Sequence, residues 1–114
     1  SFWVITGTTS KGQLSNDIRL AAQSTATVVI LMGLSKLREI TEVFKAEGKQ
    51  DTAVAVIQNG SLPNERIALG TIDTIVDIIT TEKLSAPAVI VVGDVVKLHT
   101  EFPVSLTNWE YLLS

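Results

Sequence analysis

The chain has 114 residues, the length of one ordinary domain, and its hydrophobic share of 46% is enough to bury a core. Its net charge of −3, with nine Lys and Arg residues scattered along the chain, argues against a nucleic-acid-binding module. Cysteine is absent and no apolar run approaches the ~20 residues of a membrane span, so we expect a cytoplasmic protein that contacts no membrane.

The amino-terminal part of the chain is predicted to form a strand, a loop and a short helix. Residues 2–6 (FWVIT) have the composition of a strand, and the Gly-, Ser- and Thr-rich loop 7–12 (GTTSKG) follows. A start in mid-strand, without Met, favours a piece of a longer protein. A helix is expected over Asp17–Gln23, with Ser15 or Asn16 as its N-cap.

The middle of the chain alternates between strand and helix patterns. Residues 26–33 (ATVVILMG) are a β-branched apolar run, too short for a buried helix, and indicate a central strand. Ser35 is the expected cap of an amphipathic helix that Gly48 ends, and residues 52–58 form the next strand. The apolar face of this helix consists of Leu37, Ile40, Val43 and Phe44.

Two more strands flank a helix in the second half. Residues 66–71 (RIALGT) indicate a short strand, and helical spacing begins at Ile72, with Asp73 expected in the first turn. The last strand is expected over 86–98, with Gly93 at a bulge or a close backbone approach. The alternation predicts an α/β domain with a layered sheet.

Few residues of the chain suggest catalysis. His99 is the single histidine, beyond the last strand, so neither a nucleophile triad nor a metal site is supported. Asp94 follows Gly93 in a buried strand, where a structural hydrogen-bonding role is favoured over acid–base work. The loop 7–12 lacks the Gly-Lys-Ser/Thr of a P-loop and is interpreted as a turn.

The strand ends are more informative, because ligands of open α/β sheets bind outside the carboxyl ends of strands. Three segments are unusual: 31–33 (LMG), 58–60 (QNG) and 85–88 (SAPA). After QNG the chain adds a Pro, an Asn, a Glu and an Arg, where a plain hairpin would return at once. Met32 would be a soft wall beside a flat ring. From spacing alone, the alternative that Met32 is core packing and Gly60 a turn residue stays open.

Three segments together carry a family resemblance: 28–33 (VVILMG), 52–71 (TAVAVIQNGSLPNERIALGT) and 85–96 (SAPAVIVVGDVV). In this order they resemble the carboxyl-terminal half of a tetrapyrrole methylase, most similar to the uroporphyrinogen-III C-methyltransferases within that family. The resemblance covers about residues 1–98, with 99–114 as a tail. The opening FWVITG resembles the first strand of the family's second domain, where a His usually occupies the position of Thr8, and this departure leaves the subfamily open.

The resemblance implies an α/β/α domain with a mixed sheet of about five strands. It implies an enzyme that transfers methyl groups from S-adenosylmethionine to uroporphyrinogen III, giving precorrin-2 for sirohaem and cobalamin. It also implies a homodimer of two-domain subunits with the cofactor between the domains. Carried over to this chain, Met32, Asn59 and Gly60 would line the cofactor site, with Pro87 and Ala88 as weaker matches.

The same resemblance implies an amino-terminal domain as partner, which these residues do not include. The chain would therefore form one wall of the cleft and be inactive by itself, since methyl transfer needs both reactants held in line. Two alternatives remain. One is a related methyltransferase acting on a precorrin, diphthine or ribosomal RNA, and the other is a non-catalytic ligand-binding or oligomerisation module.

Overall fold

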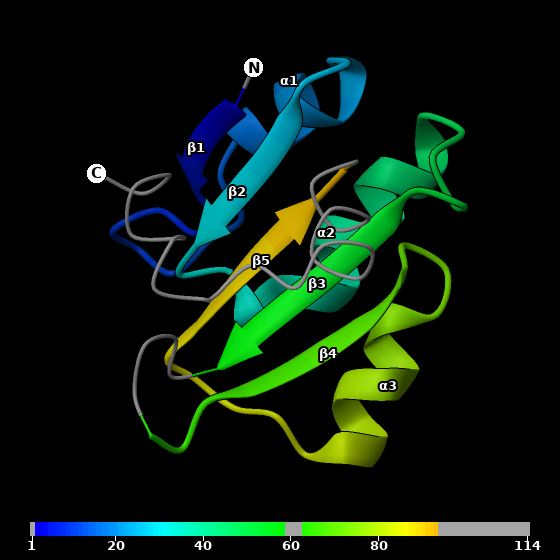
Figure 1. Cartoon of the computed structure of the whole chain (residues 1–114). Coiled ribbons are helices and arrows are strands. Elements are labelled where there is room, and N and C mark those ends of the chain that lie inside the picture. The colour runs from blue at the N-terminus through cyan, green and yellow to red at the C-terminus, as the bar shows by residue number, and fades with distance from the viewer. Residues whose placement is uncertain (1, 59–62, 94–114) are drawn as a thin grey trace.

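The computed structural model describes residues 2–58 and 63–93, and their elements alternate between strands and helices (Figure 1). In chain order the elements are β1 (Phe2–Thr6), α1 (Asp17–Gln23), β2 (Thr27–Leu31), the 3-10 turn η1 (Leu34–Lys36), α2 (Leu37–Ala46), β3 (Ala53–Gln58), β4 (Arg66–Thr71), α3 (Ile75–Glu82) and β5 (Ala88–Val92). Within the described ranges, no helix is long and apolar enough to span a membrane.

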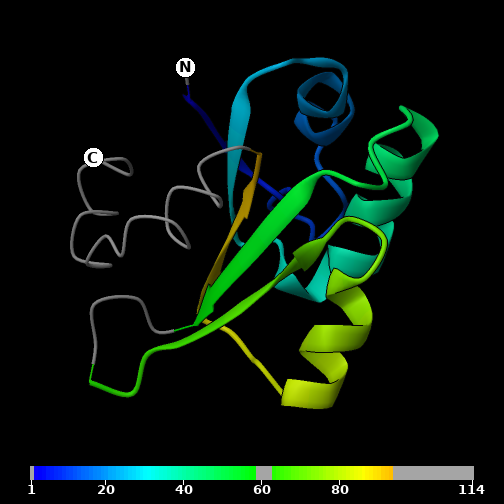
Figure 2. The same ribbon diagram turned by 45° about the vertical axis from the view of Figure 1, so that its right-hand side comes forward.

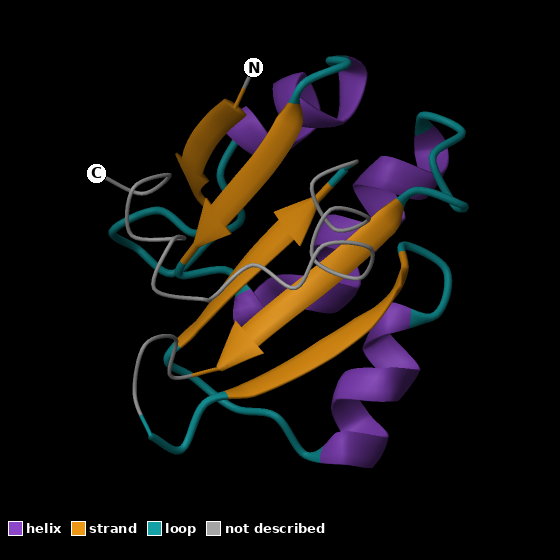
Figure 3. Cartoon of the chain, in the orientation of Figure 1, coloured by secondary structure: helices purple, strands orange, loops and turns teal. Residues whose placement is uncertain are grey.

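The five strands form one mixed sheet in the order β1-β2-β5-β3-β4. β1 and β2 are parallel, whereas β5 is antiparallel to both β2 and β3, and β4 is antiparallel to β3. Because β5 runs against its two neighbours, its amino end lies at the same edge of the sheet as the carboxyl ends of β1, β2 and β3 (Figure 3). The mixed sheet of five strands is as predicted.

The three helices of the described chain cover one face of the sheet (Figure 2). Alternate strand residues and the apolar stripes of the helices form the main core there. Its largest fully buried members are Ile18, Val28, Ile30, Ile40, Phe44, Val54, Val56, Ile72, Ile75 and Ile90. The predicted apolar face of α2 is confirmed, with Leu37, Ile40 and Phe44 buried and Val43 packed at the edge of the core.

The opposite face of the sheet carries a second, smaller apolar cluster. It consists of Val29, Ala55, Ile57 and Val91, with Leu31, Ala53, Ile67 and Val89 packed against it. No helix among the described residues packs on this face (Figure 2). The α/β fold is confirmed, and the residues described here supply one of the two helix layers expected.

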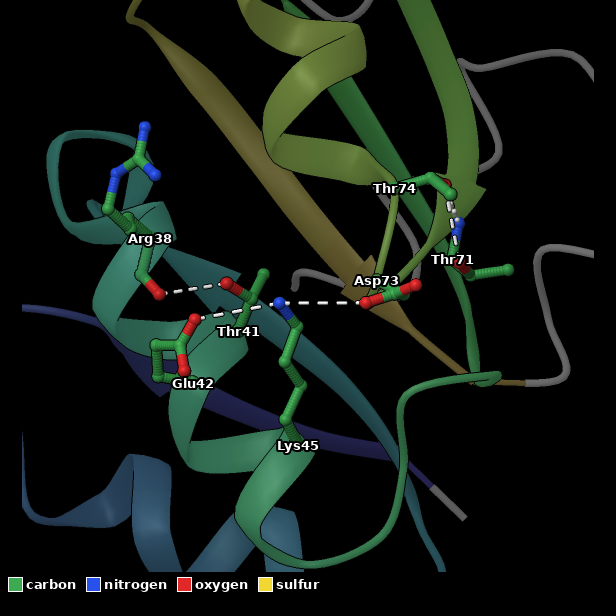
Figure 4. Close-up of polar contacts among 7 residues, drawn as sticks. All are labelled: Arg38, Thr41, Glu42, Lys45, Thr71, Asp73 and Thr74. Atoms are coloured by element: carbon green, nitrogen blue, oxygen red, sulfur yellow. Dashed lines mark hydrogen bonds and ion pairs between the residues drawn. The ribbon is translucent and has the colours of Figure 1, made fainter.

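The helix expected from Ile72 begins three residues later, at Ile75. The amides of Ile72 and Asp73 donate to the carbonyls of Thr52 (2.9 Å) and Gln50 (3.0 Å), so they belong to a loop contact and not to a helix. Asp73 therefore lies before the first turn, where Asp77 stands instead. The Asp73 carboxylate lies 3.7 Å from Lys45 Nζ of α2 (Figure 4).

The expected helix caps were partly wrong. Ser35 lies within η1, and α2 begins only at Leu37, because the amide of Lys36 donates to the carbonyl of Gly33 at 3.0 Å and closes a three-residue turn first. At α1, Asn16 holds the N-cap position without a side-chain bond, while Ser15 Oγ accepts from the amide of Asp17 at 3.2 Å.

Two glycine predictions are confirmed at the ends of elements. Gly48 follows α2 with a φ of 75°, the left-handed conformation that ends many helices. Gly93 follows β5 with a φ of 133°, and a Cβ there would lie 3.1 Å from Thr27 Cα, so the two backbones approach closely. The predicted continuation of this strand beyond Gly93, with Asp94, lies outside the described residues, and so does His99.

Candidate functional site

A pocket of about 400 Å³ opens at the edge of the sheet where β1 and β2 end and β5 begins. Its described lining comes from three separate segments of the chain: Thr8, then Met32, Leu34 and Ser35, then Ala86, Pro87 and Ala88. The structure thus brings together three of the five residues expected at a cofactor site, namely Met32, Pro87 and Ala88. The other two, Asn59 and Gly60, lie outside the described residues and stay predictions.

Met32 lies on the pocket wall and is not packed in the core. Its side chain is 70% exposed and lines the pocket, directly after the last residue of β2. Its φ of 54° is a left-handed conformation that residues with a side chain adopt uncommonly. The alternative that Met32 is a core residue is therefore wrong.

Two glycines allow the ends of β1 and β2 to meet beneath the pocket. A Cβ on Gly7 would lie only 2.6 Å from the Cα of Gly33, and a Cβ on Gly33 would lie 2.8 Å from Cγ2 of Ile30. At this crossing the amide of Gly7 donates to the carbonyl of Leu31 (2.7 Å). The backbone next to Met32 is thus fixed by close packing as well as by hydrogen bonds.

The end of β3 supports the opposite wall. Gln58 pairs with Ala88 across the sheet, and its side-chain Oε1 accepts a hydrogen bond from the amide of Ser85 at 2.7 Å. This bond fixes the start of the segment that leads through Ala86 and Pro87 into β5. At the carboxyl end of β3, Gln58 thus supports the pocket indirectly, through the Ser85 amide.

Sequence reasoning missed several residues of this site. Leu34 and Ser35 belong to η1, which no periodicity indicated, and Thr8 was noted only as a departure from a family pattern. Gln58 belongs to the QNG segment that was predicted to be unusual, but its hydrogen-bond partner, the Ser85 amide, lies 27 residues away in the chain. The pairing of β1 with β2 brings Thr8 to Met32, and the place of β5 beside β3 brings Gln58 to Ser85.

The described pocket wall is uncharged. Its side chains are apolar apart from the hydroxyls of Thr8 and Ser35, and none of them titrates near neutral pH. No three His, Cys, Asp or Glu side chains within the described ranges lie together so that they could hold a metal ion. This wall can bind and shield a flat, largely apolar ligand, but it offers no acid, base or metal ligand.

Comparisons with known proteins show the class to which this fold and pocket belong. Residues 3–76 match the family of Tetrapyrrole (Corrin/Porphyrin) Methylases. Because this match covers more than half of the chain, the chain belongs to that family.

Individual relatives agree with this assignment. The chain is 38% identical over 96 residues to the siroheme synthase of Nitrosomonas europaea, covering 83% of the chain and 20% of that protein. It is 40% identical over 91 residues to the S-adenosyl-L-methionine-dependent uroporphyrinogen III methyltransferase of Methanosarcina barkeri, covering 79% of the chain and 36% of that protein. The chain thus spans well under half the length of these two relatives.

A solved structure confirms the fold. The uroporphyrin-III C-methyl transferase of Thermus thermophilus, in complex with S-adenyl homocysteine, superposes with a TM-score of 0.74 at 21% identity. The superposition covers 86% of this chain and 43% of that one.

Proposed function

We propose that this chain is part of an S-adenosylmethionine-dependent uroporphyrinogen-III C-methyltransferase and forms one wall of its cofactor cleft. The observation that carries the proposal is the pocket that joins Met32 to Pro87 and Ala88 at the edge of the sheet. The name of the Methanosarcina barkeri relative, with 40% identity, supports the choice of methyl donor and substrate. In this proposal the product is precorrin-2, and the complete enzyme is a homodimer.

The pocket suits the adenosyl part of the cofactor. Its volume of about 400 Å³ lies within the range of small-molecule sites, and its apolar lining matches a flat heteroaromatic ring. Met32 provides a polarizable surface beside such a ring, and Pro87 and Ala88 let the ring approach the backbone. When bound, the cofactor supplies an electrophilic methyl group, while these residues hold it and exclude water.

The proposal also requires a second half. The described wall has no cationic group for the carboxylates of a tetrapyrrole, and a single wall cannot align a methyl donor with a carbon nucleophile. We therefore expect an amino-terminal domain to complete the cleft. On this basis the chain alone binds weakly and does not transfer methyl groups.

Calorimetric titration with S-adenosylhomocysteine tests the proposal, first on the chain alone and then with the amino-terminal half added. Ser35→Trp would fill the pocket from an exposed position, and we expect it to abolish binding to the pair. Arg38→Trp is the matched control, because Arg38 is also exposed, close by on α2, but does not line the pocket.

Methyl transfer itself is then measured on the pair with uroporphyrinogen III. The expected product has gained two methyl groups, which mass spectrometry detects directly. If both halves fold but bind no S-adenosylhomocysteine, the cofactor assignment is wrong. If they bind it but leave uroporphyrinogen III unmethylated, the substrate belongs to another branch of the family.

A further inference from the structure

The residue after Gly7 holds the carbonyl of Met32. Thr8 Oγ1 donates a hydrogen bond to this carbonyl at 3.1 Å, next to the bond from the amide of Gly7 to the carbonyl of Leu31 at 2.7 Å. The Thr8 side chain thus continues, by one residue, the hydrogen bonding that joins the ends of β1 and β2. Thr8 and Met32 also line the same pocket.

The conformation of Met32 needs such support. Among the described residues, only Met32 and Lys83 combine a side chain with a positive φ, and Lys83 is the C-cap of α3, a common place for it. Met32 follows a strand and has no helix end to explain its φ of 54°. A residue with this geometry persists where its surroundings hold it, and such residues gather at ligand sites.

Thr8 is itself well anchored. It forms an isolated antiparallel bridge with Leu14, and the amide of Ser15 donates to the carbonyl of Gly7 at 2.9 Å. The loop between β1 and α1 therefore provides a fixed point from which the Thr8 hydroxyl reaches Met32. The family resemblance places a His at this position, so the hydroxyl contact to Met32 is a feature in which this chain departs from the family pattern.

We propose that Thr8 is a positioning residue for the cofactor pocket. By binding the carbonyl of Met32, its hydroxyl keeps Met32 left-handed, with the exposed side chain on the pocket wall. Thr8 therefore sets cofactor affinity through Met32. This inference rests on the proposed function and adds the residue that shapes its binding wall.

Three substitutions in the complete protein test the role of the hydroxyl. Thr8→Val keeps the shape but removes the donor, and we expect the Kd for S-adenosylhomocysteine to rise about 3- to 10-fold, the range of one lost hydrogen bond. Thr8→Ser keeps the donor and should restore the Kd to within about twofold of wild type. Thr80→Val removes a similar bond, from Oγ1 to the carbonyl of Val76 at 2.9 Å, away from the pocket, and should leave the Kd unchanged.

A double-mutant cycle distinguishes positioning from simple stabilisation. Glycine adopts positive φ without a side-chain penalty, so in a Met32→Gly background Thr8→Val should have little further effect on the Kd. An equal effect of Thr8→Val in both backgrounds would show that Thr8 does not act through Met32. A lower melting temperature with an unchanged Kd would reduce Thr8 to a structural residue.

The outcomes for the two proposals are separate. If the wild-type protein binds no S-adenosylhomocysteine, the proposed function fails, and the pocket role of Thr8 fails with it. If wild type binds and Thr8→Val binds equally well, only the inference about Thr8 is overturned. Should Thr8→Val not fold, Thr8→Ala removes the same hydroxyl without a branched side chain, and the same comparison decides.

Discussion

Substitution of Gly7 by alanine should be among the most damaging single-methyl changes in this chain. The added Cβ would lie 2.6 Å from Gly33 Cα and 3.3 Å from Gly33 N. Both atoms are backbone, so no rotamer change relieves the contact, and β1 must move away from the end of β2. The movement stretches the bonds that join Gly7 to Leu31 and Thr8 to Met32.

The expected cost follows from these contacts. Overpacking of this kind costs about 1–3 kcal/mol, and each weakened hydrogen bond adds about 1 kcal/mol. We therefore expect Gly7→Ala to lower the free energy of unfolding by about 3–5 kcal/mol. The loss is measured by urea unfolding, as a lower midpoint at an unchanged m-value.

Gly70→Ala is the matched control for this substitution. Its Cβ would lie 2.6 Å from Cδ1 of Ile78 and 2.8 Å from Oγ1 of Thr74, but both are side-chain atoms and can shift without moving a strand. Gly70 lies in β4, and alanine there should cost only about 1–2 kcal/mol, because the Thr74 hydroxyl also accepts a hydrogen bond from the Thr71 amide and must give slightly. If the two substitutions prove equally costly, or Gly7→Ala costs under about 0.5 kcal/mol, the close approach of the Gly7 and Gly33 backbones is refuted.

Three further predictions concern the supports of the pocket and the core. Gln58→Met removes the acceptor of the 2.7 Å bond from the Ser85 amide, and we expect calorimetry to show a several-fold higher Kd for S-adenosylhomocysteine. A changed unfolding midpoint with an unchanged Kd would contradict a role of Gln58 at the pocket. Phe44→Ala empties a position that is 1% exposed and should cost about 3–5 kcal/mol in urea unfolding, and a loss below about 1 kcal/mol would show that α2 is not packed on the sheet as described. Lys45→Met breaks ion pairs with two exposed carboxylates, Glu42 (3.5 Å) and Asp73 (3.7 Å), and should change the free energy of unfolding by less than about 0.5 kcal/mol. A larger loss in urea unfolding would show that these pairs matter more than their exposure suggests.

The sequence predicted best those elements whose pattern is local. The bounds of β1, α1 and β4 agree with the predicted ranges, because alternation, capping residues and helical spacing all lie within each segment. The start of α3 was misplaced because the amides of Ile72 and Asp73 bind carbonyls some twenty residues earlier. Periodicity contains no information about such a contact.

The sequence predicted several residues that line the pocket, but not the residues whose hydrogen bonds hold that lining in place. Strand-end reasoning and the family resemblance together selected Met32, Pro87 and Ala88, and the structure places all three on one pocket. The supporting residues Thr8 and Gln58 act through the carbonyl of Met32 and the amide of Ser85, which lie far from them in sequence. Predicting these partners would require the strand order, and local pattern does not determine it.

The central position of β5 also determines when the pocket forms during folding. Among the described strands, only β5 joins the parallel pair β1–β2 to the antiparallel pair β3–β4 in one sheet. Two-stranded units are at best marginally stable alone. We therefore expect the sheet to stay in two separate parts during synthesis until β5 has left the ribosome. Since the residues leading into β5 are also a wall of the pocket, a nascent chain acquires its stable core and its binding surface in the same late step.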